Sequence, residues 1–464
     1  MNDSNDPFFV FGNAPNLGAF SASEYVKTFE RGFEPDLNFN VSDVRARRLF
    51  ERRDVGLKLE SDVHERAFYA DALAAGVGIA GIGLMGVSIA AAFIGAGIKV
   101  VAYDSCLGAR ETAKERVKKE LAAQRARNGL ACPQKEDEEK FVASVVDSLV
   151  NTTGDIRDLG ILPVVVESIP EKLKLKEKFY RDLAKVAKRR ILLLTNTSSL
   201  RVEDLAEALS NDENDLLCRE RFAAFHFFHP VVKRNLVEIA PNRLTNAETL
   251  LEARLLGRKI GKLPIVVNDG PGLLVNRLLQ AYLNEALRLL DFGFDAKRLE
   301  ALCKKIGMEG TPLRMIDEIG VDVALHSGWS FLKAFPDRAH NSPTLVGLVR
   351  EGRLGRKTTR GFYRFSSKES WANDAVLDCD KETLEKLRKD AFETSEKPIP
   401  NQDYISDQYA AMRILEAILY EAKRAVDEKI VGSYREADAG LVLALGFPPQ
   451  KGGIFYWAIA AGRI

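Results

Sequence analysis

The sequence is short of the features that mark several broad classes of protein. Its five cysteines are scattered and form no Cys-x-x-Cys pair, so neither a disulfide framework nor a metal site is predicted. Lys and Arg number 67 and Asp and Glu 66, and the net charge of +1 gives no general attraction to nucleic acid. No apolar run approaches the roughly 20 residues that span a bilayer. A nucleic-acid-binding, membrane-spanning or disulfide-stapled protein is therefore not expected.

The two ends of the chain carry no recognisable targeting signal. Residues 1–8 include two aspartates and lack the basic and apolar profile of a signal or transit peptide. The last four residues, Ala-Gly-Arg-Ile, are not a peroxisomal targeting tripeptide of the Ser-Lys-Leu type. We therefore expect a cytoplasmic protein, and a length of 464 residues predicts two to four domains.

Short apolar runs alternate with amphipathic stretches between residues 76 and 269, a pattern typical of a doubly wound parallel sheet. Strands are predicted at residues 77–80, 99–104, 163–167, 191–196, 221–227, 236–239 and 264–268. A long, charged helical insertion is predicted at about residues 111–149, and a charged helical segment at residues 45–75.

The second half of the chain changes to helical spacing, which predicts helices at residues 273–292, 296–306 and 315–327. The segment Ala281-Tyr-Leu-Asn-Glu-Ala286, with Asp291 behind it, is echoed by Ala417-Ile-Leu-Tyr-Glu-Ala422 with Asp427 at the same distance. This repeat predicts a duplicated helical domain. The fold class is predicted as α/β, a Rossmann-type doubly wound parallel sheet followed by two duplicated all-α domains.

These patterns divide the chain into five predicted segments. The first two are an N-terminal arm with a helical linker at residues 1–75 and a nucleotide-binding domain at residues 76–268. A first helical domain at residues 269–366, a polar linker at 367–403 and a second, shortened helical domain at 404–464 complete the chain.

A glycine motif, Gly81-Ile-Gly83-Leu-Met-Gly86, joins the first predicted strand to an apolar helix. The first glycine permits a tight turn, the second lets the backbone approach a pyrophosphate, and the third lets the helix pack closely on the strand. Asp104 ends the next predicted strand, where a carboxylate accepts ribose hydroxyls and repels a 2′-phosphate. The motif therefore predicts NAD as cofactor rather than NADP, while a tight turn without nucleotide is the structural alternative.

Polar residues cluster where further strands end or helices begin: Ser198 after one strand, His226 at the end of another, and Asn276 at the start of the helical region. A near-neutral imidazole suits removal of a hydroxyl proton during hydride transfer, and the carboxylate of Glu238 would orient it. Ser198 and Asn276 are candidates to hold the substrate.

Each of these residues also has an ordinary structural explanation. A lone histidine at a strand end is more often structural, and the second serine of the pair, Ser199, is expected to cap a helix. Glu238 is hardest to explain in that way, because a carboxylate in an apolar strand needs a partner. The joint occurrence of these residues favours a catalytic site.

Together the motifs resemble the 3-hydroxyacyl-CoA dehydrogenase family, and most of all the dehydrogenase part of the peroxisomal type 1 and bacterial multifunctional enzymes of fatty-acid oxidation. The resemblance runs from about residue 77 to the C-terminus. It rests on Asn196-Thr-Ser-Ser, His226-Phe-Phe-x-Pro, Leu236-Val-Glu-Ile, Gly270-Pro-Gly, Val275-Asn-Arg277 and Leu354-Gly-Arg-Lys-Thr-x-x-Gly-Phe-Tyr363.

The resemblance implies roles for these residues. His226 would be the base, Glu238 its partner, and Ser198 and Asn276 substrate contacts. Glu171 and Lys176 would lie near the nicotinamide end of NAD, and Lys357 would reach the cofactor, although a charged helix start and a solvated loop lysine explain them almost as well. Candidate contacts to coenzyme A, for which a solvated charged face is the simpler explanation, are Arg110, Lys114 and Lys118.

The resemblance also implies that the second helical block replaces a partner subunit, so a monomer is expected, with a homodimer as the alternative. A peroxisomal location stays open by resemblance. Three departures from the family pattern stand out. His229 occupies a position where relatives have a small polar residue, only about 75 residues precede the nucleotide domain, and the chain stops before the expected last helices. The short N-terminal stretch predicts that a hydratase-isomerase domain is absent.

The predicted reaction is oxidation of (3S)-3-hydroxyacyl-CoA by NAD to 3-oxoacyl-CoA and NADH. A dehydrogenase of free β-hydroxy acids is the rival among enzymes. A nucleotide-binding scaffold that has lost turnover is the rival outside them, supported only by His229 and the early end of the chain.

Overall fold

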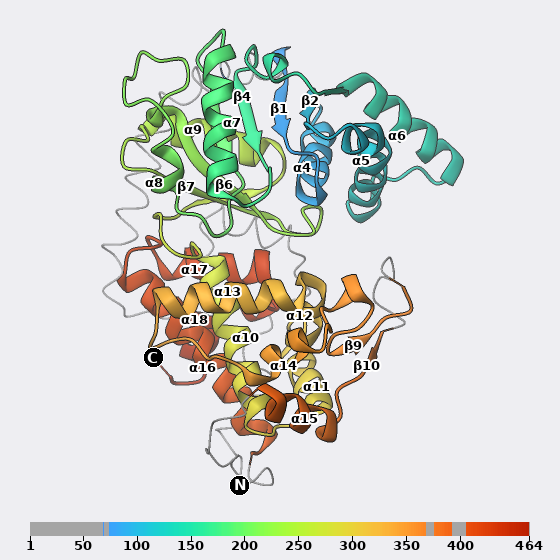
Figure 1. Cartoon of the computed structure of the whole chain (residues 1–464), viewed down its shortest axis with the longest axis vertical. Helices are drawn as coiled ribbons and strands as arrows, with labels where there is room; N and C mark the ends of the chain where they lie inside the picture. The colour runs from blue at the N-terminus through green and yellow to red at the C-terminus, as the bar shows by residue number, and fades with distance from the viewer. Residues whose placement is uncertain (1–67, 69–73, 368–374, 392–404, 464) are drawn as a thin grey trace. The chain divides into compact units, whose positions relative to one another are not determined.

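The computed structural model describes residue 68 and residues 74–367, 375–391 and 405–463. These residues form two compact units (Figure 1). The α/β unit extends to Leu273 and includes Ile430–Ser433, and the helical unit contains Leu274–Lys429 and the residues from Tyr434 onward. The helix predicted at residues 45–75 falls almost wholly outside the described residues. No helix within the described ranges is long and apolar enough to cross a membrane.

An eight-stranded sheet organises the α/β unit, with the strands in the order β3-β2-β1-β4-β5-β6-β7-β8. The short strands β1, β4 and β5 are mainly apolar and are buried on both faces, as expected for a sheet covered by helices on both sides. The strands are β1 (Val77–Ala80), β2 (Val100–Tyr103), β3 (Val150–Thr153), β4 (Val164–Glu167), β5 (Leu192–Thr195), β6 (Phe222–Phe227), β7 (Leu236–Pro241) and β8 (Leu263–Val266).

The direction of β7 corrects the expectation of a wholly parallel sheet. Strands β1 to β6 are parallel, but β7 runs antiparallel to β6, and β8 runs parallel to β7. Only residues 228–235 connect β6 to β7. A parallel return needs a crossover of about a dozen residues or more, so this loop is long enough only for an antiparallel pair.

Strand β3 was not predicted, because its sequence Val-Asn-Thr-Thr has one apolar residue and it lies at the edge of the sheet. The predicted insertion at residues 111–149 is a pair of helices, α5 and α6, that packs with α4 and α9 into the apolar cluster over the sheet. The helices of this unit are α4 (Leu84–Gly95), α5 (Leu107–Arg127), α6 (Lys135–Leu149), α7 (Leu173–Val186), α8 (Val202–Ala206) and α9 (Ala247–Lys259).

The helical unit is built around the long helices α10 and α16, which pack against each other. Local capping signals set several boundaries, for example Asp295 before α11 and the left-handed Gly307 after it. The helices are α10 (Val275–Asp291), α11 (Ala296–Ile306), α12 (Pro312–Ile319), α13 (Val321–Ala334), α14 (Pro343–Arg350), α15 (Lys381–Ala391), α16 (Asp407–Asp427), α17 (Tyr434–Gly440) and α18 (Ile454–Ala460).

Two expectations for this region need correction. The single helix predicted at residues 315–327 is interrupted at Gly320, whose φ of +105° ends α12 and begins α13. The segment at residues 367–403, expected to be a linker, contains the short strand β10 (Val376–Leu377), paired with β9 (Tyr363–Arg364), and helix α15. A Cβ on Gly347 of α14 would lie 2.4 Å from the carbonyl oxygen of Leu387, so α15 packs directly on α14.

Helices α10 and α16 carry the repeated sequence segments, and their ion pairs are reciprocal. Arg277 of α10 donates to Glu421 of α16 at 2.6 Å, and Arg413 of α16 meets Glu285 of α10 at 2.8 Å. Arg413 occupies the place in the second repeat that Arg277 occupies in the first, and Glu421 corresponds to Glu285. The two helices therefore pair antiparallel, as two copies related by a twofold axis would.

Candidate active site

In the glycine loop after β1, the surroundings of Gly81 and Gly86 leave no room for a side chain, whereas Gly83 has free space beside it. A Cβ on Gly81, whose φ is +90°, would lie 2.6 Å from the carbonyl oxygen of Ser168, and a Cβ on Gly86 would lie 1.8 Å from that of Gly81. A Cβ on Gly83 would meet no atom within 4 Å, and no side chain caps α4 there. An exposed backbone at an uncapped helix N-terminus fits the pyrophosphate of a dinucleotide.

Asp104, directly after β2, ties this loop to the start of α5. Its Oδ2 accepts the backbone N–H of Ile82 and its Oδ1 that of Cys106, both at 2.9 Å. The side chain is only partly buried. A carboxylate offers about four acceptor sites, so both oxygens keep the capacity to accept ribose hydroxyls.

His226 and Glu238 face each other across the antiparallel strands β6 and β7, where they are register partners. His226 Nδ1 lies 2.8 Å from Glu238 Oε2, and the two residues are 4% and 0% exposed. Because a carboxylate only accepts hydrogen bonds, Nδ1 is the donor, and in the neutral imidazole Nε2 then presents a lone pair. Among the described residues, only Nδ1 of the ring has a hydrogen-bond partner.

The neighbours of His226 hold the end of β6 in place. Asn196, at the end of β5, accepts the backbone N–H of Phe227 through Oδ1 at 2.8 Å. The ring of Phe228 meets the imidazole edge-on, with centroids 4.6 Å apart. His229, which departs from the family pattern, is exposed, and its peptide bond to Pro230 is cis.

Lys262 supports the loop that joins His226 to Glu238, a role that sequence reasoning missed. Its ammonium donates to the carbonyl oxygens of Val231 at 2.6 Å and Arg234 at 2.8 Å. The side chain is buried, and burial lowers the pKa of Lys262 to about 7, with a small further contribution from Arg127. A lysine immediately before an apolar strand was the only signal in the sequence.

Glu171 organises the serine loop after β5. Its Oε1 accepts the hydroxyl of Thr197 at 2.7 Å and the backbone N–H groups of Ser198 at 2.8 Å and Ser199 at 2.9 Å. Burial by itself would raise the pKa of Glu171, but the Lys176 ammonium and these donors outweigh it and lower the pKa to about 2. Glu171 is thus a carboxylate at all ordinary pH values.

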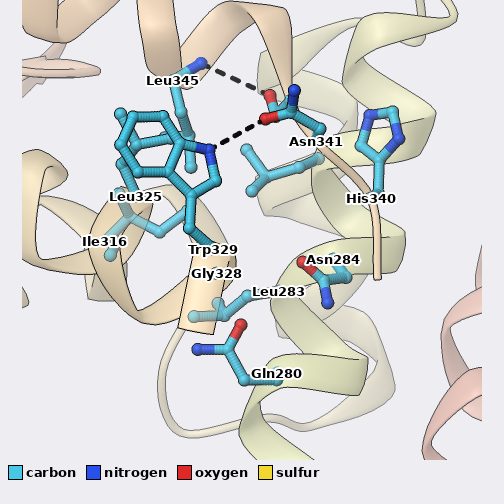
Figure 2. A pocket seen from close by; sticks show the side chains of 13 residues that line it. Gln280, Leu283, Asn284, Ile316, Leu325, Gly328, Trp329, His340, Asn341 and Leu345 are labelled. Carbon is cyan, nitrogen blue, oxygen red and sulfur yellow. Dashed lines mark hydrogen bonds between the residues drawn. The ribbon is translucent and has the colours of Figure 1, made fainter. Parts of the chain in front are cut away.

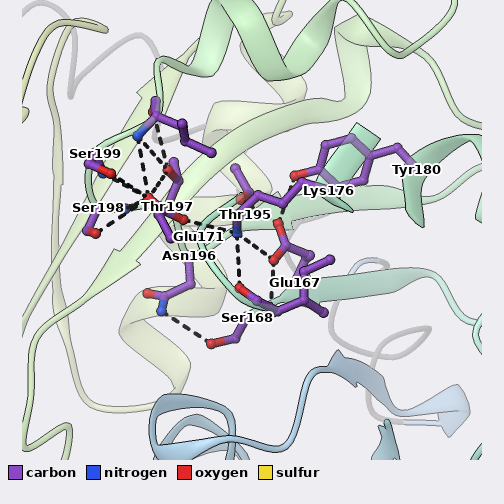
Figure 3. A network of polar contacts seen from close by, with 12 residues as sticks. Glu167, Ser168, Glu171, Lys176, Tyr180, Thr195, Asn196, Thr197, Ser198 and Ser199 are labelled. Atoms are coloured by element: carbon purple, nitrogen blue, oxygen red, sulfur yellow. Dashed lines mark hydrogen bonds and ion pairs between the residues drawn. The ribbon is translucent and has the colours of Figure 1, made fainter. Parts of the chain in front are cut away.

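The buried carboxylate of Glu167, at the end of β4, was not predicted (Figure 3). Lys176, fully buried, places its ammonium 2.6 Å from Glu167 Oε1 and 3.3 Å from Glu171 Oε2. The other donors to Glu167, each at 2.8 Å, are the hydroxyls of Tyr180 and Thr195 and the backbone N–H of Ile169. The signal available in the sequence was the one used for Glu238, an acidic residue in an apolar strand.

The expected cap at Ser199 is wrong. Helix α8 begins after Arg201, and its first amides, those of Val202 and Glu203, donate to the side chain of Asp269 at 3.0 and 3.1 Å. Asp269 lies far along the chain, immediately before the Gly-Pro-Gly turn, so local sequence rules do not reveal this cap. Ser199 instead donates its backbone N–H to Glu171.

Asn276 and Lys357 belong to the helical unit. Asn276 lies in the first turn of α10 and is half-buried. Lys357, in the turn Arg356–Thr358, pairs with Asp322 of α13. The structure thus brings together His226 with Glu238, and Ser198 with Glu171 and Lys176, whereas these two residues are positioned within the other unit.

The coenzyme A candidates lie on one face of α5, since positions 110, 114 and 118 are four residues apart. Arg110 donates to the carbonyl oxygen of Asp104 at 2.6 Å, Lys114 lies 3.6 Å from Asp147, and Lys118 pairs with Glu115 at 2.8 Å. All three therefore have protein partners. No cluster of His, Cys, Asp and Glu suited to a metal occurs in the part of the chain that the structure describes.

Comparison with protein families identifies both units. Residues 76–270 match the NAD-binding domain of 3-hydroxyacyl-CoA dehydrogenase, and residues 272–365 match its C-terminal domain. The chain is 34% identical over 300 residues to the fatty acid oxidation complex subunit alpha of Vibrio cholerae, covering 64% of this chain and 39% of that protein. The chain thus spans about two fifths of the length of this curated relative.

Solved structures agree with this assignment. A (S)-3-hydroxybutyryl-CoA dehydrogenase from Ralstonia eutropha has a TM-score of 0.55 at 28% identity, over 63% of this chain and 99% of that one. A 3-hydroxybutyryl-CoA dehydrogenase from Escherichia coli has a TM-score of 0.64 over 83% of this chain and 91% of that one. Its identity of 23% shows a common fold alone.

Proposed function

Because the chain belongs to the 3-hydroxyacyl-CoA dehydrogenase family, we propose that it oxidises a (3S)-3-hydroxyacyl-CoA to the 3-oxoacyl-CoA with NAD, as in fatty-acid β-oxidation. The observation that carries the proposal is the buried His226–Glu238 pair at the end of β6. A histidine with one ring nitrogen held by a carboxylate and the other presenting a lone pair is equipped to take a hydroxyl proton.

In the forward direction, His226 Nε2 takes the proton of the 3-hydroxyl as the hydride leaves C3. Bound NAD supplies the acceptor for that hydride. Glu238 keeps the imidazole in the required tautomer and stabilises the imidazolium that forms. In reverse, the imidazolium returns the proton to the oxygen of the 3-oxo group.

The remaining polar residues have binding roles in this proposal. Ser198 and Asn276 contact the substrate, and the open backbone at Gly83 and the carboxylate of Asp104 hold NAD. Glu171 lies near the nicotinamide end. Lys176, fully buried against Glu167 and Glu171, acts as a positioning residue for Glu171 rather than as a direct contact.

Lys357 is assigned a contact with the cofactor only by resemblance. Its pairing with Asp322 means that it would have to exchange that partner to reach NAD. Arg110, Lys114 and Lys118 would likewise have to exchange partners to reach coenzyme A, because Arg110 donates to a carbonyl oxygen and the two lysines pair with carboxylates.

The reciprocal ion pairs between α10 and α16 support a duplicated helical domain that replaces the partner subunit. We therefore expect a monomer in solution. Sedimentation equilibrium at several protein concentrations measures this directly, and a mass twice that of the chain would contradict it.

The test of the proposed activity is oxidation of NADH by acetoacetyl-CoA, followed by the absorbance of NADH. We expect turnover with acetoacetyl-CoA and none with free acetoacetate. Turnover with acetoacetate would favour a dehydrogenase of free β-hydroxy acids. Tight NADH binding with no turnover on any thioester would favour the non-catalytic scaffold.

A further inference from the structure

A pocket in the helical unit, between α10, α13 and residues 340–345, is too small for a substrate or a cofactor (Figure 2). Apart from the open solvent at its mouth, it has space for about one water molecule. Gln280 of α10 donates to Ser327 of α13 at 2.9 Å, and Trp329 of α13 donates to Asn341 at 3.2 Å, so its polar groups join the segments around it. The cofactor loop of the α/β unit, in contrast, is contacted by a charged side chain that has no role in the proposed chemistry.

That side chain is Arg116 of α5. Its Nη1 donates to the carbonyl oxygen of Ile82, 34 residues earlier in the chain, at 2.8 Å. Ile82 is the second residue of the glycine motif, between Gly81 and Gly83. Arg116 is half-buried, and its bond to Ile82 is the only hydrogen bond or ion pair that it makes among the described residues. The guanidinium therefore has no carboxylate partner there that would explain its position.

Ile82 is held on three sides. Its N–H donates to Asp104 Oδ2 at 2.9 Å, its carbonyl oxygen accepts from Arg116, and its side chain is 1% exposed. Asp104 follows β2 and Arg116 belongs to the helix that comes next, so one segment of the chain holds both backbone groups of Ile82. The peptide groups before and after Ile82 are thus each bound by a side chain.

The bond to Arg116 determines which way the N–H of Gly83 points. The peptide between Ile82 and Gly83 is trans, because the only cis peptide among the described residues is His229–Pro230. In a trans peptide the C=O and the N–H point to opposite sides. A carbonyl turned toward Arg116 therefore directs the Gly83 N–H away from Arg116.

This peptide needs such a constraint because glycine follows it. Rotation of the peptide group changes ψ of Ile82 and φ of Gly83, and glycine adopts positive φ about as readily as the observed φ of −71°. A Cβ on Gly83 would meet no atom within 4 Å, so packing does not oppose the rotation. The glycine that lets a phosphate approach the backbone thus also lets the backbone turn its N–H away.

We propose that Arg116 is a positioning residue for the cofactor: by holding the Ile82 carbonyl, it keeps the Gly83 N–H turned toward the pyrophosphate of NAD. A charged donor on the carbonyl also polarises the peptide and strengthens its N–H as a donor. The inference rests on the part of the proposed function that places NAD at Gly83.

The Arg116→Met variant removes the donor and keeps an aliphatic side chain. The Kd for NADH, measured by fluorescence titration, should rise by about tenfold, because a hydrogen bond to a charged phosphate loses its alignment. The circular-dichroism spectrum should stay that of the wild-type protein. Lys119→Met, which removes an exposed positive charge from the same helix, is the matched control and should leave the Kd within about twofold. Equal increases in the two variants would assign the effect to the charge of α5 and overturn the proposal.

The Gly83→Ala variant tests whether Arg116 acts through Gly83. A methyl group in the free space beside Gly83 keeps the pyrophosphate from this N–H, so the affinity for NADH should fall. In that background Arg116→Met should raise the Kd by less than about threefold, because the N–H that Arg116 orients no longer meets a phosphate. A tenfold rise in both backgrounds would show that the two changes act independently, and would overturn the route through Gly83.

The two proposals fail in different ways. If the wild-type protein binds NADH and Arg116→Met binds it equally well, the role of Arg116 is wrong and the proposed function stands. If the wild-type protein does not bind NADH, the placement of NAD at the glycine loop fails and the role of Arg116 fails with it.

Discussion

Two of the buried pairs of a carboxylate and a base in the α/β unit look alike in sequence but differ in construction. Glu238 and His226 sit on neighbouring strands, and Glu167 and Lys176 on a strand and the helix that follows it. Both carboxylates are 0% exposed. Glu167 accepts hydrogen bonds from four donors around it, so its pair with Lys176 stabilises the local structure, and we call this pair the anchor.

The pair at His226 leaves the second ring nitrogen of the imidazole without a hydrogen bond among the described residues. The imidazole has one nitrogen bound and a second with a lone pair, whereas the ammonium of Lys176 is enclosed between Glu167 and Glu171. A base that must accept a proton needs an acceptor site with no hydrogen bond. A buried pair that only stabilises the fold is most stable when every donor and acceptor is hydrogen-bonded. Burial of an acidic residue beside a base does not by itself distinguish the two uses.

The largest effect is expected on turnover, and it distinguishes the His226–Glu238 pair from the Glu167–Lys176 pair. The His226→Gln variant should lose turnover by about 10³-fold or more, because no other group takes the hydroxyl proton, while the affinity for NADH stays nearly unchanged. Steady-state kinetics and NADH fluorescence titration measure the two quantities. Loss of NADH binding as well would remove His226 from the chemistry.

The next largest effect is expected on stability, when the Glu167–Lys176 pair is broken. The Glu167→Gln variant leaves the Lys176 charge buried with one carboxylate fewer, and we expect the free energy of unfolding to fall by about 3 kcal/mol. Denaturation by urea measures it. Asp182→Asn, which breaks the surface pair with Lys178 on the same helix, should cost under about 1 kcal/mol. Equal losses would mean that burial does not set the strength of the Glu167 pair.

A smaller effect on catalysis is expected at Glu238, the proposed partner of the base. The Glu238→Gln variant presents an amide to Nδ1, which disfavours the tautomer that the reaction needs, so kcat should fall by about 10²-fold. The free energy of unfolding should change by only about 1 kcal/mol, because a neutral imidazole can still pair with the amide. A stability loss as large as that of Glu167→Gln would assign Glu238 an anchoring role.

The smallest effect is expected on the pH dependence of stability at Lys262, a buried base that donates to two carbonyl oxygens. Its folded-state pKa of about 7 is below the ordinary 10.5, so between these values the unfolded chain binds more protons and stability rises with pH. Relative to Lys262→Met, the wild-type protein should gain about 1–2 kcal/mol from pH 7 to about pH 8.5 in urea denaturation. A flat difference between the two proteins would show that Lys262 is not neutral when buried.

Several features of the fold could be predicted because they depend on local patterns. The glycine motif depends on the backbone conformation of a few consecutive residues, and helix α11 matches its predicted range because its cap and its terminal glycine lie in the sequence itself. The alternation of apolar runs likewise predicted the positions of seven strands to within two residues or so.

Other features depend on partners that a linear pattern does not name. The polar strand β3 is a strand only because β2 offers it an edge, and Glu167 is an anchor only because Tyr180, Thr195 and Lys176 converge on it. The cap of α8 comes from Asp269, more than sixty residues away.

The sequence alone therefore singled out the candidate residues for the proposed chemistry, because a nucleotide loop and an acid–base pair each require particular side chains in particular local settings. Only the tertiary structure decided how these side chains are used. The register of β6 with β7 aligned His226 with Glu238, and the packing of α7 brought Lys176 and Tyr180 to Glu167. The reason is physical: burial and hydrogen bonding depend on which segments meet, and that is settled by packing over the whole chain.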